Sequence, residues 1–236
     1  MLTEKKYSEY LIYAIGEILL VVIGILIALG IKGYDQTIKE RKFEQHLNSR
    51  IHQEYNQNKK ILNQRINSIN QSTNSTHELM KLMNKDLSYL NTKTIDSLIY
   101  YSIHYVAYNP LTTTLTEITQ TGKIEIISNQ KLKDLLYQWS IEFENNRSTF
   151  KIFEKWVEDG VLPYLSKNIA LKNIDKFGQL KWKENSEFDS DYDKVFKDRE
   201  FENILENHLY LHSLMLNDYQ KLESIIKEIL KITEYK

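Results

Sequence analysis

The N-terminal part of the chain is apolar from Leu11 to Ile31, and Glu17 is the only charged residue in this stretch. A helix of about 21 residues crosses the roughly 30 Å hydrocarbon core of a bilayer. A cleaved signal peptide is the rival interpretation, but its apolar core runs to only about 7–15 residues. The pattern therefore predicts an uncleaved, single-pass transmembrane helix with the lipid bilayer as its first partner.

From about residue 34 to residue 90 the chain contains no Gly and no Pro, and apolar residues recur every three or four positions. This spacing gathers apolar side chains on one face of a helix. At 1.5 Å per residue the helix would reach about 85 Å. Residues 72–76 are all Ser, Thr or Asn, which are weak helix formers, so we expect a bend or break there.

Two later segments share this periodicity and predict long helices at about 128–159 and 198–235. Shorter helices are expected at about 94–108 and 113–121, and the polar stretch of about 164–194 is expected to be mostly loop. Amphipathic helices cover one another's apolar faces, usually in an antiparallel bundle.

Turn-forming residues mark the ends of these helices. The residue before Pro110 disfavours helix, and Gly122 supplies the left-handed conformation that ends one. Gly160 and Pro163 are expected to end the helix before them, and Asp198 to cap the last helix.

The predicted fold is therefore all-α: one N-terminal transmembrane helix running into a long helix, followed by an antiparallel helical bundle. Residues 1–33 form a short tail and the transmembrane helix, and residues 34–236 form the bundle domain. The later helices span only about 50–60 Å, so the first helix leaves turns near the membrane without an intramolecular partner. We expect the stretch near Ile38 to Ile51 to be a stalk that pairs with another subunit.

One face of the predicted span is lined by small residues. Gly16, Gly24 and Ala28 share this face with Leu20, and Gly24 and Ala28 are four apart, a spacing that lets a second helix approach closely. The alternative is that Gly is simply common in membrane helices. We expect a homo-oligomer through the transmembrane helix and stalk, with another membrane protein as a further candidate partner.

Glu17 is an intramembrane polar residue that lies about two turns inside the apolar run, where a charge facing lipid is costly. A structural interpretation makes it a protonated carboxyl that bonds across a helix pair or reaches the headgroups. A functional interpretation makes it a proton- or ion-carrying group in a larger complex.

Composition excludes several classes of function. Lys and Arg total 31 and Asp and Glu total 32, without the basic surplus of a nucleic-acid-binding protein. The absence of Cys excludes thiolate catalysis and Cys-ligated metals. No Gly-rich phosphate loop or local catalytic motif occurs, so we expect a non-enzymatic protein without a cofactor.

The orientation of the chain in the membrane has two opposing indicators. Lys5 and Lys6 precede the span, while more basic residues follow it, and this count favours a cytoplasmic C-terminal part. Signal-anchor proteins with a short N-tail and a large C-terminal domain usually export the domain instead, because long domains translocate largely regardless of charge.

Two groups of residues have the spacing of metal ligands. His208 and His212 are four apart on a predicted helix, as in helical zinc sites, although histidines also tolerate the edge of an apolar stripe. A calcium-binding loop is the second candidate, because acids stand at its positions 1, 3, 5 and 12. However, Lys194 stands where that loop needs Gly. The four acids are Asp189, Asp191, Asp193 and Glu200.

A tyrosine-rich stretch ends the first short predicted helix. Tyr101 and Tyr105 are candidates to line a ligand pocket between helices, as in bundle-type sensor domains. The alternative is ordinary core or boundary packing with the hydroxyl groups in water.

The run from Tyr13 to Leu29, YAIGEILLVVIGILIAL, resembles the membrane signature of an uncharacterised family of bacterial single-span proteins. Residues 121–133 and 197–203 resemble the same family. The resemblance implies an N-inside orientation in the bacterial inner membrane, with the helical domain in the periplasm. It supplies no catalytic residues.

The sequence as a whole predicts a membrane-anchored, non-enzymatic helical scaffold or sensor-like domain. We expect it to self-associate and to bind a partner or a small ligand. The alternative function is that of a subunit in an ion- or proton-driven membrane complex that uses Glu17.

Overall fold

The computed structural model describes the backbone of residues 2–234 and the side chains of residues 15–234. The side chains of Lys5, Lys6 and Tyr13, and the predicted end of the last helix at residue 235, lie outside this part of the chain. Every regular element among the described residues is helical, so the all-α prediction is confirmed.

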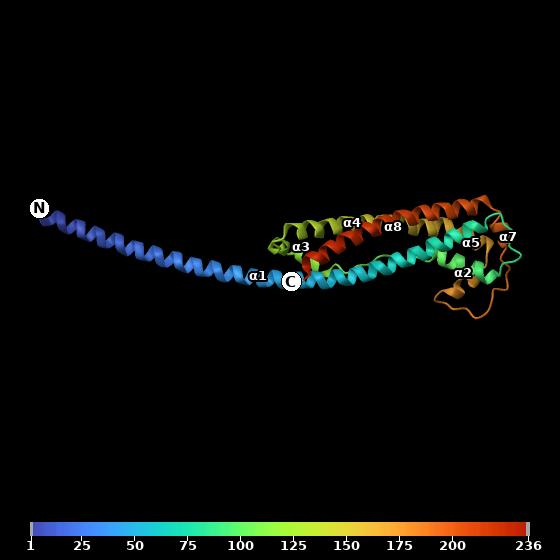
Figure 1. The fold of residues 1–236 in the computed structure, drawn as a ribbon, viewed down its shortest axis with the longest axis horizontal. Coiled ribbons are helices and arrows are strands. Elements are labelled where there is room, and N and C mark those ends of the chain that lie inside the picture. The colour runs from blue at the N-terminus through green and yellow to red at the C-terminus, as the bar shows by residue number, and fades with distance from the viewer. Residues whose placement is uncertain (1, 235–236) are drawn as a thin grey trace.

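The first element, α1 (Leu2–Leu82), is one uninterrupted helix of 81 residues. At the usual rise per residue it is about 120 Å long, and its N-terminal part projects far from the rest of the molecule (Figure 1). The side chains of residues 15–31 are all exposed, and an 18-residue apolar window of α1 has a mean hydropathy of 2.4. By length and composition, α1 is able to cross a membrane.

Further helical elements follow α1 along the chain. They are α2 (Thr92–Ile103), α3 (Thr113–Gln120), η1 (Lys123–Ile126), α4 (Gln130–Trp156), η2 (Val157–Val161), α5 (Leu162–Asn168), α6 (Leu171–Ile174), η3 (Asp175–Phe177), α7 (Tyr192–Val195) and α8 (Arg199–Thr233). Of these, α4 and α8 are the long ones.

The bundle is organised around α8, which packs against both α1 and α4. Helices α1 and α4 run in the same direction and α8 runs against both, so the predicted antiparallel packing holds for α8 with each neighbour (Figure 1). Residues 104–112 form no helix and return the chain along the bundle from α2 to α3. Trp139, Tyr55 and Phe153 are among the largest side chains in the shared core.

The predicted break at residues 72–76 is wrong, because α1 continues to Leu82. Ser72 and Thr76 are buried, and the Thr76 hydroxyl donates to the Ser72 carbonyl one turn earlier. Packing against the bundle outweighs the low helix propensity of these residues.

The predicted stalk is wrong over its second half. Leu47 and Ile51 are each 1% exposed, because α3, η1 and the end of α8 pack beside this part of α1. Lys123 lies 5.2 Å from the Phe43 ring centroid, and Glu44 accepts hydrogen bonds from Ser128. The bundle therefore begins near residue 43, and only a short exposed tether separates it from residue 31.

The predicted helix end at Gly160 and Pro163 is also wrong. A wider turn of π-helix, η2, joins α4 to α5, and Pro163 falls in the first turn of α5. Proline lacks the N–H that an α-helix would require there, and the wider turn accommodates that loss. Gly122 has a φ of 69°, so the predicted left-handed stop after α3 is confirmed.

Candidate functional site

The middle of the bundle contains a small cavity of about 20 Å³, on which α1, residues 104–106, α4 and α8 converge. This volume suits one water-sized occupant. Tyr105 and His212, two of the residues singled out from the sequence, line it, whereas Tyr101 does not. Tyr101 instead packs edge-on against Tyr100, with ring centroids 5.2 Å apart.

Tyr105 reaches this cavity because residues 104–112 form an extended strap and not the end of a helix, as the sequence predicted. The strap is held by Asn58, which is fully buried on α1. The Asn58 side-chain amide donates to the Leu111 carbonyl at 2.8 Å and accepts from the Leu111 N–H at 2.7 Å. A side chain thus provides the two hydrogen bonds that a neighbouring strand would otherwise supply.

His208 and His212 lie side by side beneath the cavity, with ring centroids 4.4 Å apart and exposures of 2% and 1%. Nε2 of His208 donates to the Ser102 carbonyl at 2.8 Å. The two ring nitrogens of His212 face the hydroxyls of Ser72 at 3.2 Å and Thr73 at 3.1 Å. These residues form a polar cluster inside an otherwise apolar core.

Burial sets the charge of both rings. It lowers the pKa of His208 to about 4 and, with the nearby His208 and His77, the pKa of His212 to about 3. Both imidazoles are therefore neutral at pH 7. The order of Ser72, His212 and Thr73 is that of a nucleophile, a base and an orienting group, but a threonine stands where hydrolases have a carboxylate. Ser72 is 2% exposed and its hydroxyl is bonded to the Ser102 carbonyl.

Neither predicted metal site is assembled: His208 and His212 are adjacent but have no third ligand among the described residues, and the four acids of the predicted calcium loop have other roles. Among the described residues no group of three or more His, Asp or Glu side chains is arranged to hold a metal ion. Asp191 caps α7 by accepting from the Lys194 N–H at 3.0 Å, and Asp193 pairs with Lys197 at 2.8 Å. Glu200 lies in the first turn of α8, and Asp189 lines a separate surface hollow.

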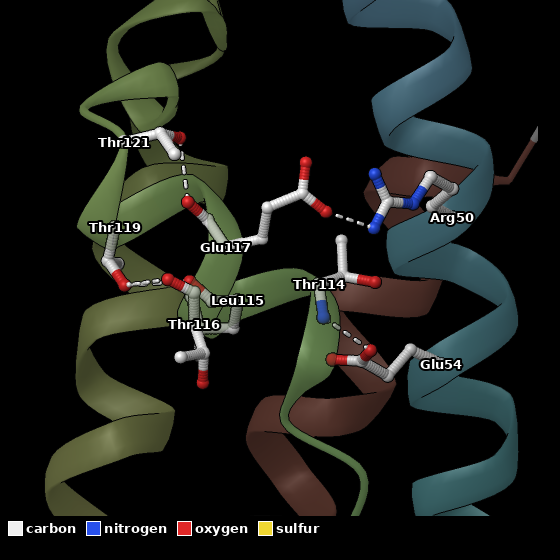
Figure 2. Close-up of polar contacts among 8 residues, drawn as sticks. All are labelled: Arg50, Glu54, Thr114, Leu115, Thr116, Glu117, Thr119 and Thr121. Carbon is white, nitrogen blue, oxygen red and sulfur yellow. Dashed lines mark hydrogen bonds and ion pairs between the residues drawn. The ribbon is translucent and has the colours of Figure 1, made fainter.

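The end of the bundle nearer the apolar run is held together by two acids and an arginine that the sequence analysis did not single out (Figure 2). Arg50 on α1 pairs with Glu117 on α3 at 2.6 Å and lowers the pKa of that carboxyl. Glu54 accepts from the Thr114 N–H at 2.7 Å, and so caps α3 from a neighbouring helix. Thr112, at the N-cap position itself, makes no capping bond.

The side chains of residues 15–31, the described part of the predicted span, are all exposed. Gly16 and Gly24 would each accept a Cβ without meeting another atom within 4 Å, and Glu17 is exposed. At 100° per residue, Glu17, Gly24 and Ala28 lie within about 40° of one another around the helix. The carboxyl therefore belongs to the small-residue face.

No protein-family model, curated protein or solved structure matches this chain. The resemblance of the membrane run to a bacterial single-span family thus stays a prediction.

Proposed function

We propose that this protein is a single-span bacterial membrane protein whose helical domain is a self-associating, non-enzymatic sensor or scaffold. The observation that supports it is the continuity of α1, which carries the exposed apolar residues 15–31 and, in the same unbroken helix, the buried bundle residues from Leu47 onward. Because α1 is one continuous helix, a displacement of its bundle half also moves its apolar end. The cavity lined by Tyr105 and His212 lies against the same helix and supports the proposal as a candidate binding site.

Membrane fractionation tests the anchor. Membranes from expressing cells are washed at alkaline pH, and we expect the intact chain to stay in the pellet. A double variant, Val22→Lys with Leu26→Lys, should release it, because each lysine near the middle of a span costs about 2.5–3.5 kcal/mol. The matched control places the same charges at Gln57 and Asn63, which are exposed on the bundle part of α1. Intact wild-type protein in the supernatant would exclude an anchor.

The orientation that the family resemblance implies places the helical domain in the periplasm. Protease added to intact spheroplasts then digests the domain, and digestion only after the inner membrane is opened would place it in the cytoplasm instead.

The alternative function, a subunit of an ion- or proton-driven membrane complex, is favoured by one feature, the carboxyl of Glu17 within the apolar run. A Glu17→Gln variant that assembles normally but loses an ion-dependent activity of its membrane supports this alternative. Full activity of the variant excludes it.

A further inference from the structure

We propose that the cavity in the middle of the bundle is a binding site for a small inorganic anion of halide size, held by Arg65. The inference rests on the proposed function, because it names the class of ligand that the cavity of the proposed sensor or scaffold would bind.

Arg65 is the first observation. It projects from α1 into the wall of the cavity, and it forms no ion pair and no hydrogen bond with the described residues. Its Nε is buried without an acceptor. Arginine stays charged in proteins, so this guanidinium is a half-buried positive charge without a counter-charge in contact with it.

The other polar groups of the cavity are the second observation. Ser68 lies one turn further along α1, and Tyr219 faces it from α8. Tyr219 is 1% exposed, yet neither its hydroxyl nor that of Ser68 has a hydrogen-bond partner in the described protein. The positive charge of Arg65 acts on the Tyr219 hydroxyl and opposes the rise in its pKa that burial causes.

The side-chain donors that line this cavity have no anionic acceptor in its wall. Arg65 can only donate, Ser68 and Tyr219 can each donate, and no carboxylate lines the wall. His212 is already engaged with Ser72 and Thr73. An anion satisfies all three donors and supplies the missing charge, and charge-assisted hydrogen bonds are the strong ones.

The size of the cavity limits the anion. A volume of about 20 Å³ holds one water-sized occupant, which suits a halide and not a nucleotide or sugar phosphate. Water is the competing occupant, because the hydroxyl groups of Ser68 and Tyr219 can also accept hydrogen bonds from it. The guanidinium charge favours an anion over water, since only an anion supplies a counter-charge.

Chloride is the probe, and the full-length protein in detergent is the sample. Thermal unfolding is followed while sodium chloride replaces sodium gluconate at constant ionic strength. We expect a saturable rise in Tm with chloride, because a ligand that binds only the folded state stabilises it. Arg65→Met should abolish the rise. Arg147→Met, which removes an exposed arginine paired with Glu144 on α4, should leave it intact.

Two milder variants keep the test decisive if Arg65→Met does not fold. Ser68→Ala and Tyr219→Phe each remove one donor and leave the charge, and each should raise the chloride midpoint about tenfold. Equal Tm values in chloride and gluconate, an undiminished rise in Arg65→Met, or unchanged midpoints in both milder variants would overturn the proposal and leave water as the occupant. The membrane anchor is tested by fractionation, which does not depend on chloride, and the anion site is tested by the chloride dependence of Tm. Either proposal can therefore fail without the other.

Discussion

At the scale of single residues, the bundle is unusual in burying two adjacent neutral histidines in its core. The rings of His208 and His212 lie tilted against Phe153, with centroids 5.0 and 5.3 Å from its ring. Their hydrogen-bond partners are hydroxyl and carbonyl groups from distant parts of the chain. Such a cluster holds the rings without charge, and protonating either ring would place an imidazolium in an apolar core.

We therefore expect the free energy of unfolding to fall by about 4 kcal/mol between pH 7 and pH 5. The pKa values of His208 and His212 in the folded protein are lowered to about 4 and 3, against 6.5 when unfolded. As the pH falls through 6.5, the unfolded chain takes up protons that the folded chain takes up only near pH 4 and 3. Stability is thus full above pH 6.5 and is lost below it.

Urea unfolding followed by circular dichroism at pH 7, 6 and 5 measures this dependence. His212→Gln should roughly halve the loss, whereas His46→Gln, at an exposed position on α1, should leave it unchanged. A free energy of unfolding that stays constant from pH 7 to pH 5 would contradict the assigned pKa values.

The sequence marked the histidine pair but not its role. The four-residue spacing shows that the two rings share a helix face, whereas Ser72 and Thr73, about 140 positions earlier, become partners only through packing. Arg65 likewise carries no local signal that separates it from arginines on the surface. Long-range contacts decide both cases, and periodicity contains no information about them.

At the scale of elements, periodicity predicted those features that local spacing determines. Helices α3, α4 and α8 lie close to their predicted ranges, whereas α1 ends at Leu82, short of the predicted residue 90. Asp198 caps α8 as expected by accepting from the Glu200 N–H at 2.8 Å. The errors lie where a partner far along the chain decides the conformation, as at residues 72–76 and in the extended strap of residues 104–112.

The strap yields a prediction of its own. Asn58→Ala should lower the free energy of unfolding by about 2 kcal/mol, because the Leu111 N–H and carbonyl both lose their partner. Asn63→Ala, an exposed asparagine on the same helix, should change it by less than about 0.5 kcal/mol. Chemical denaturation of both variants at pH 7 measures the difference, and equal stabilities would show that Asn58 does not hold the strap.

At the scale of the whole molecule, the single helix α1 joins the exposed apolar run to the bundle. The apolar end of α1 has no neighbouring element, while its other half is one wall of the bundle (Figure 1). Because the bundle begins near residue 43, the tether is too short for a stalk of the predicted length. The small-residue face of the apolar run is therefore the main candidate surface for the proposed self-association.

Cysteine crosslinking maps that face, because the chain has no cysteine of its own. Leu20→Cys and Ile31→Cys lie on the side of Gly24 and Ala28 and should form disulfide-linked dimers in membranes. Val22→Cys and Leu29→Cys on the opposite side should not. Equal crosslinking at all four positions would indicate random encounter and not a specific helix pair.

The central claim is that α1 is one rigid helix from the apolar end into the bundle. The direct measurement is the distance between spin labels at Leu29→Cys and Gln57→Cys, in protein reconstituted into nanodiscs and diluted with unlabelled chain. The account predicts one narrow peak near 42 Å, from 28 residues at about 1.5 Å each. A broad distribution, or a peak well below 42 Å, would show a hinge between the two parts and contradict it.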